Sequence, residues 1–208
     1  MAEARGRPKS FEDGEALDAA VMLFWTHGYE GASVDALCRE MNMPRATLYA
    51  RFGDKEGLFR AAVARYAETR VAPVLSALWA GGGLRADLEA FYAAVLALCT
   101  ANEAAPGCLI SCALADAAGA NPAFREELAE RFAAMEERIT ARLVAAGWDA
   151  RAATPPEVAA GLAATLARGL TLAARAGTAE AELRKTAAAA TPAILRLAPE
   201  HVVAVCEA

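Results

Sequence analysis

Apolar residues recur along this chain every three to four positions. The first such stripe lies at Leu17, Ala20, Val21 and Phe24, and similar stripes follow to near the C-terminus. This period places apolar side chains on one face of a helix, whereas strict alternation would indicate strands. Because the sequence has no alternating runs of β-branched residues, we predict an all-α fold of about nine helices.

Glycine, proline and capping residues divide these stripes into segments. Gly28, Asn42 and Gly53 mark the ends of three short helices near the N-terminus. A long helix is expected over residues 54–80, with a break or kink at Pro73, which cannot donate a hydrogen bond to the preceding turn. The remaining helices are expected over residues 84–102, 108–119, 121–146, 154–177 and 178–197.

Residues 33–52 predict two short helices joined by a tight turn. The first has one apolar face, formed by Val34, Leu37, Cys38 and Met41. Ser33 precedes that face and can cap the helix. Asn42 tolerates the left-handed conformation that often ends a helix, and Pro44 is suited to open the second helix.

The second helix of this pair has two core anchors, Leu48 and Phe52. Its other positions carry small or hydrogen-bonding side chains, namely Arg45, Ala46, Thr47, Tyr49, Ala50 and Arg51. Helix-turn-helix modules lay such a second helix in the major groove, which is about 12 Å wide. An ordinary helical hairpin with a solvated face would show the same spacing, so both interpretations remain open at this point.

Lys55 stands in the first turn of the following helix, where a positive charge opposes the helix dipole. A phosphate oxygen bound at that helix start would explain the lysine. Neutralisation by Asp54 and Glu56 is the alternative explanation.

Three segments resemble the DNA-binding domain of TetR-family transcriptional regulators. They are G-R-P-K-S-F from Gly6, L-F-W-T-H-G-Y-E-G-A-S-V from Leu23, and T-L-Y-A-R-F-G-D-K-E-G-L-F from Thr47. The resemblance implies a helical homodimer that binds a palindromic operator and usually represses until a small ligand binds its other domain. It also implies DNA contacts from Ser33, Arg45, Ala46, Thr47, Tyr49, Arg51 and Lys55. Two positions depart from the family pattern, which usually has Gly at Asn42 and Ser or Thr at Pro44.

The expected organisation has four parts. Residues 1–10 form a flexible basic arm, 11–53 a three-helix DNA-binding bundle, 54–200 an effector-binding and dimerisation domain, and 201–208 a tail. The resemblance places the dimer contact in the last two helices, within residues 155–197. Alternatively, these alanine-rich helices only close the core of their own chain.

The effector site is expected among the helices of residues 54–146. Its candidate lining residues are Trp79, Phe91, Tyr92, Cys99, Cys108, Phe132 and Met135. Few charged residues fall on these inner faces, so we expect an apolar effector. Side chains of these types in such positions are more often plain core than ligand contacts.

Two of the cysteines suggest an alternative mode of regulation, by chemical modification of a thiol. Cys108 and Cys112 are one helical turn apart, with Cys108 near a helix start, where the dipole lowers the pKa of a thiol. TetR-family members that sense oxidants or electrophiles have such a thiol, and the P-G-C-L-I context resembles theirs. An inert buried pair is the other interpretation. The five scattered cysteines and the lack of a signal peptide or an uninterrupted apolar span favour reduced thiols and a cytoplasmic location.

Charge and composition limit the remaining functions. A formal net charge of −5 is unusual for a nucleic-acid-binding protein, although arginines and lysines gather at the N-terminus and around residues 45–55. The two histidines are peripheral, and we find neither a phosphate loop nor a paired-carboxylate motif, so we expect no enzyme, cofactor or metal site. The sequence therefore predicts a ligand-responsive repressor. The alternatives are a thiol-responsive repressor and, from another class, a helical protein-interaction module that does not bind DNA.

Overall fold

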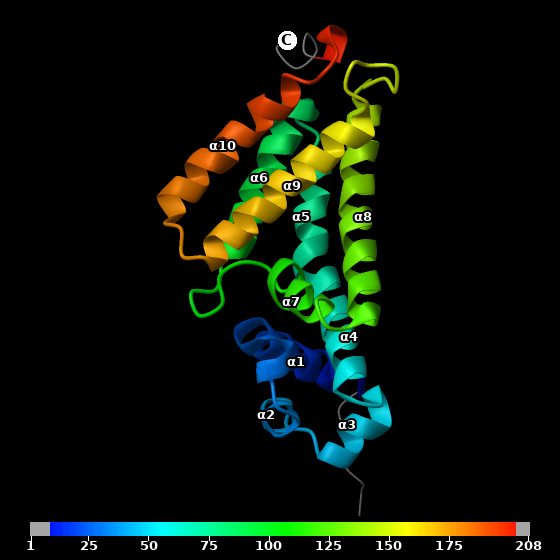
Figure 1. Ribbon diagram of the computed structural model, residues 1–208, viewed down its shortest axis with the longest axis vertical. Helices are drawn as coiled ribbons and strands as arrows, with labels where there is room; N and C mark the ends of the chain where they lie inside the picture. The colour runs from blue at the N-terminus through cyan, green and yellow to red at the C-terminus, as the bar shows by residue number, and fades with distance from the viewer. Residues whose placement is uncertain (1–8, 203–208) are drawn as a thin grey trace, which may run out of the picture.

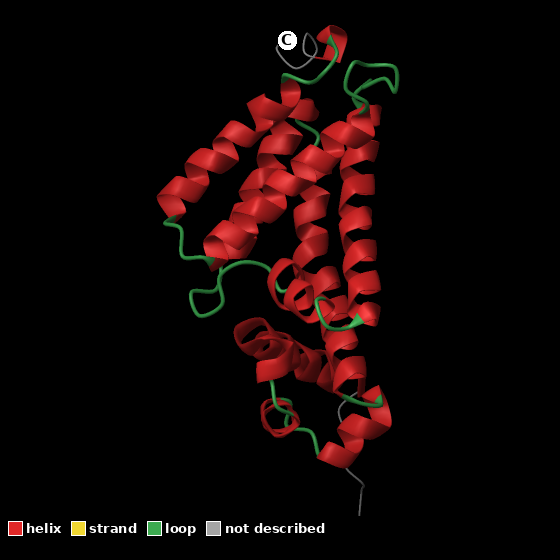
Figure 2. Cartoon of the chain, viewed as in Figure 1, coloured by secondary structure: helices red, strands yellow, loops and turns green. Residues whose placement is uncertain are grey.

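The computed structural model describes the backbone of residues 9–202, with side chains from residue 14 onward. Within that range the chain forms helices and no strands, which confirms the predicted all-α class (Figure 2). A small bundle made by the first helices lies at one end, and longer helices extend away from it (Figure 1). The expected arm of residues 1–10 falls mostly outside the described residues, and α1 already begins at Lys9.

The small bundle consists of α1 (Lys9–Gly31), α2 (Val34–Glu40) and α3 (Arg45–Phe52). Gly28, with φ 72°, interrupts α1 near its end. The caps follow the sequence prediction. The Ser33 hydroxyl accepts from the Ala36 N–H at 3.2 Å, and Asn42 adopts φ 48°. Pro44 lies one position earlier than expected, since it precedes α3 rather than opening it.

The predicted long helix from residue 54 is interrupted before Pro73. α4 (Lys55–Tyr66) passes into a π-helical turn (Ala67–Val71), then α5 (Ala72–Ser76) and a 3₁₀ turn (Ala77–Trp79). In the wider turn the Ala72 N–H donates to the Ala67 carbonyl five residues back. Because Pro73 has no N–H to donate, the irregular turn falls beside it and the chain stays helical throughout.

The larger part of the molecule contains five further α-helices: α6 (Gly83–Thr100), α7 (Ala115–Ala118), α8 (Pro122–Ala145), α9 (Pro156–Arg175) and α10 (Glu180–Leu195). A second π-helical turn, Ile110–Leu114, leads into α7. The chain thus has ten α-helices among its described residues rather than about nine. The difference arises in the residue 54–80 segment, which counts as α4 and α5.

The buried apolar side chains form two clusters. One joins α5, α6, the C-terminal half of α8, α9 and α10. The other joins α1 to α4 with residues 105–118 and with Phe124 in the first turn of α8. The small N-terminal bundle therefore shares a continuous core with the loop before α7, with α7 and with the start of α8.

Candidate nucleic-acid interface

Helix α3 offers an almost wholly exposed face. Its fully buried side chain is Leu48, and Phe52 is half-buried. The five predicted contact residues on this helix are exposed: Arg45, Ala46, Thr47, Tyr49 and Arg51. An eight-residue helix held mainly by Leu48 leaves most of its surface available to a flat or grooved partner.

Arg45 links α3 to α2 and to its own next turn. Its guanidinium donates to the Asp35 carboxylate at 3.1 Å and to the Tyr49 hydroxyl at 3.3 Å. All three side chains are exposed. Exposed ion pairs contribute little to stability, about 0–1 kcal/mol, so Arg45 can exchange these partners for a phosphate or a base edge.

Lys55 lies beside this face, at the start of α4. Its ammonium donates to the Glu30 carbonyl at 3.4 Å and lies 4.5 Å from the centre of the Tyr29 ring. Asp54 caps the helix by accepting from the Gly57 N–H at 2.8 Å. A Cβ at Gly57 would lie 2.0 Å from the Phe52 carbonyl oxygen, so glycine permits the close turn that sets α4 against α3. Ser33 and the exposed residues of α3 thus belong to the small bundle, and Lys55, at the start of the adjoining α4, contacts that bundle through α1.

Apart from Trp79, the predicted effector residues divide between the two buried clusters. Phe91, Tyr92 and Cys99 are buried in the cluster of the larger domain, and Met135 packs against it. Cys108 is buried in the other cluster, with Phe132 against it, and Trp79 is half-exposed, at 50%. Helical periodicity placed Phe91, Tyr92 and Cys99 inward correctly but not Trp79. It also could not show which neighbouring side chains fill the space between the buried ones.

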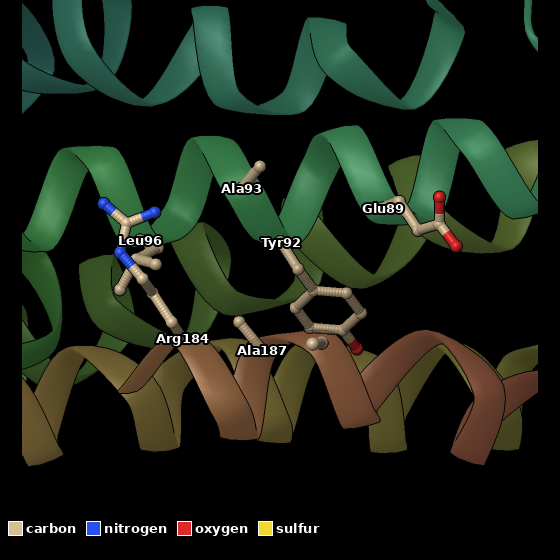
Figure 3. Close-up of a pocket in the computed structure, with 7 residues that line it drawn as sticks. Glu89, Tyr92, Ala93, Leu96, Arg184 and Ala187 are labelled. Carbon is tan, nitrogen blue, oxygen red and sulfur yellow. The ribbon is translucent and has the colours of Figure 1, made fainter. Parts of the chain in front are cut away.

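Hollows in the described part of the chain include two that border the larger domain, which we take as candidates for ligand binding. One, of about 330 Å³, lies between α6 and α10; of the predicted effector residues, Tyr92 lines it. Figure 3 shows Arg184 and Glu89 toward opposite ends of this groove, with the Tyr92 ring between the helices. Sequence reasoning did not identify Arg184 or Glu89, because charged residues on outward helical faces are ordinarily solvated.

The second hollow, of about 490 Å³, lies between the end of α1, the segment Ser111–Asp116 and the end of α9. Cys112 and Arg175 both line it. The Arg175 guanidinium donates to the carbonyl of Trp25 in α1 at 3.4 Å, across a separation of 150 residues. This interdomain cleft therefore touches the DNA-binding bundle directly.

The paired thiols differ in their surroundings. Cys108 is buried, whereas Cys112 is half-buried on the cleft wall. Burial raises the pKa of Cys112, and the nearby Arg175 charge opposes that shift. Burial, and then the neighbouring Cys108 thiol, raise the pKa of Tyr66. For Cys112, desolvation thus outweighs the opposing effects of its backbone hydrogen bond and of Arg175.

These features can be compared with known proteins. Residues 16–62 match the family model described as bacterial regulatory proteins, tetR family. The transcriptional repressor ComR of Escherichia coli K12 is 38% identical over 109 residues, which is 52% of this chain and 52% of ComR. The chain thus spans about half the length of this curated relative.

Solved structures match over nearly the whole chain. A cysteine mutant of the TetR-family regulator CifR, complexed with a 26 bp operator duplex, is 30% identical, with TM-score 0.77, over 90% of this chain and 99% of CifR. Another CifR cysteine mutant complexed with operator DNA covers 92% of this chain and 99% of CifR at 28% identity and TM-score 0.77. The reduced form of E. coli NemR, at 18% identity, shares the fold with TM-score 0.75 over 87% of this chain and 95% of NemR. The chain therefore belongs to the TetR family of bacterial transcriptional regulators.

Proposed function

We propose that this protein is a dimeric transcriptional repressor that binds a palindromic operator through α3 and is released by a small effector. The observation that carries the proposal is the exposed face of α3, anchored by Leu48, with Lys55 at the adjoining start of α4. ComR is a repressor and CifR binds operator DNA, which supports the same role here. We infer that the protein acts as a regulator rather than as an enzyme, and that it does so in the cytoplasm.

The contacts divide by chemistry. Arg45, Thr47, Tyr49 and Arg51 can donate to phosphate oxygens or base edges, while Ala46 lets the helix backbone approach closely. Ser33 and Lys55 would hold phosphates at the starts of α2 and α4. We also infer that the described arrangement is the DNA-competent one, because it matches operator-bound CifR over 92% of the chain.

The dimer is proposed to form along α9 and the end of α8. The large exposed apolar side chains in this region are Val144, Val158, Leu162, Leu166 and Leu172. The described part of α10 exposes no large apolar side chain, so we propose that most of the contact lies on α9, within the residues 155–197 expected from the sequence. α9 is long and apolar enough to cross a membrane by length and composition, but 44% of that window is buried in the protein. A partner subunit would cover its exposed leucines.

We propose that residues 11–53 bind DNA and that residues 54–200 bind the effector and form the dimer. An apolar effector would enter the domain built around α6, α8, α9 and α10. It would have to bind the off-DNA state more tightly than the DNA-competent one, since a ligand without such a preference shifts no equilibrium.

Lys55→Ala tests the DNA contact. We expect operator affinity to fall about tenfold or more, because each dimer loses two charged phosphate contacts. The slope of log affinity against log salt concentration should become smaller by about one per subunit. Fluorescence anisotropy across a salt series, with a duplex selected from random DNA by the purified protein, measures both. Lys185→Ala on α10, whose side chain is 73% exposed, is the matched control.

Two results would oppose the proposal in different ways. Equal affinities of the wild type and Lys55→Ala would remove Lys55 from the interface. A wild-type protein that binds no duplex at low salt would favour the helical interaction module instead, because phosphate contacts dominate affinity there.

A second candidate function is release by electrophiles, and the position of Cys112 on the interdomain cleft favours it. N-ethylmaleimide would form a bond to Cys112 Sγ while the thiol proton passes to the neighbouring maleimide carbon. The adduct would then occupy the cleft between α1 and α9. We expect operator affinity to fall about tenfold, with Cys112→Ser abolishing the response.

Cys38→Ser is the control for this response, since Cys38 is also half-buried but lies in α2. Peptide mass spectrometry identifies the modified thiol. Unaltered DNA binding after complete alkylation of Cys112 would eliminate the thiol branch and leave the ligand-responsive repressor intact.

A further inference from the structure

The first turn of α8 contacts the DNA-binding bundle beside Lys55. Asn121 caps α8 by accepting from the Ala123 N–H through Oδ1 at 2.9 Å. Its Nδ2 donates at 3.0 Å to the Glu56 carboxylate, which lies 65 residues earlier in the first turn of α4. One side chain thus fixes the start of one helix and binds it to the start of another. Glu56 follows Lys55 directly in sequence.

Phe124 forms the apolar half of the same contact. Its ring is fully buried and packs edge-on against Phe59 of α4, with 5.1 Å between centroids. It also packs edge-on against Tyr29 of α1, with 4.9 Å between centroids. A buried aromatic in two such pairs resists sliding, because each pair contributes about 0.5–1.5 kcal/mol beyond its buried area.

Tyr29 connects this contact to Lys55. The Lys55 ammonium lies over the ring that Phe124 supports from α8. A tyrosine ring is neutral at physiological pH, and burial, followed by the carboxylates of Glu56, Glu30 and Asp54, raises the pKa of Tyr29 further. A neutral aromatic face attracts a cation. The ammonium thus contacts both the Glu30 carbonyl and a ring that Phe124 of α8 helps to hold, together with Phe24 and Phe59.

We propose that Asn121 and Phe124 are positioning residues for Lys55, and that the first turn of α8 transmits movement of the effector domain to the DNA-binding surface. The inference rests on the proposed function, in which Lys55 holds a phosphate. In the DNA-competent arrangement the contact is formed. An effector that displaces α8 breaks it, and Lys55 loses the support that holds it at the start of α4.

The Asn121→Asp variant keeps the cap of α8 but removes the hydrogen bond to Glu56. Aspartate remains a good N-cap, but its second carboxylate oxygen faces Glu56 where a donor stood, and like charges repel. We expect operator affinity to fall about fivefold, a typical coupling between sites, and the salt dependence to fall with it as Lys55 disengages from phosphate. The N121D/E56Q double variant restores the hydrogen bond with donor and acceptor exchanged, and should recover most of the affinity.

The Asn121→Asp and Lys55→Ala double variant tests whether Asn121 affects DNA binding through Lys55. If Asn121 acts through Lys55, then N121D has no further effect in the K55A background. Equal losses in both backgrounds, an unchanged affinity for N121D, or no recovery by E56Q would overturn the proposal. Thermal melting of every variant detects a general loss of folding, which E56Q would not repair.

The operator affinities of K55A and N121D separate a failure of the proposed DNA contact from a failure of the proposed role of α8. If K55A itself leaves affinity unchanged, the proposed DNA contact fails and the positioning role fails with it. If K55A weakens binding while N121D does not, only the role of α8 is refuted.

Discussion

Replacing Leu162 and Leu166 together by glutamate converts the protein to a monomer and lowers operator affinity about 100-fold or more. This loss is expected because a monomer binds one half-site at a time, whereas a dimer binds both together. Both side chains lie on α9, four residues apart, and are 47% and 36% exposed in the single chain. A two-fold interface places the same patch of both subunits in contact. Four carboxylates would then be desolvated without partners, which is strongly unfavourable. Sedimentation velocity and fluorescence anisotropy measure the two effects.

The matched control is Ala189→Glu on the exposed face of α10. We expect it to leave both the dimer and operator binding unchanged. The opposite pattern, in which Ala189→Glu dissociates the dimer and the α9 variant does not, would return the interface to α10. A monomer that still bound the operator with full affinity would contradict the requirement for two half-sites about 34–36 Å apart.

The second large effect is expected at a buried ion pair. Arg142 Nε donates to Asp87 Oδ2 at 2.8 Å, and the two residues are 8% and 1% exposed. The other Asp87 oxygen accepts from the Gly81 N–H at 3.0 Å. Arg142→Ala would leave that carboxylate buried without its cation, so we expect the free energy of unfolding to fall by about 3–5 kcal/mol. Urea denaturation followed by circular dichroism measures it.

Two further variants show how much of the expected loss of stability is due to the burial of the ion pair and how much to the unpaired charge. Arg184→Ala removes an arginine whose side chain is 68% exposed, and an exposed pair contributes about 1 kcal/mol at most. Removing both partners as D87L/R142M should recover part of the loss, because no charge is then left unpaired. A loss below about 1 kcal/mol for Arg142→Ala would show that water reaches Asp87 and replaces the guanidinium.

The N-terminal bundle was the part most completely predicted from the sequence. Its helix ends depend on contacts within a few residues, such as Ser33 with the Ala36 N–H and Asp54 with the Gly57 N–H. Such caps are encoded locally. The exposure of α3 followed in the same way, because periodicity left Leu48 and Phe52 as its anchors. The resemblance to TetR-family regulators rested on these residues, and the comparisons confirmed it.

What the sequence by itself determined was therefore helical class, most helix ends of the N-terminal bundle and the face of α3 that is free to meet a partner. Only the tertiary structure decided which segments meet. Asn121 lies 65 residues from Glu56, and Arg175 lies 150 residues from Trp25. The physical reason is that periodicity fixes the direction of a side chain relative to its own helix axis. Which helix packs opposite it depends on the simultaneous burial of many apolar faces, a property of the whole chain.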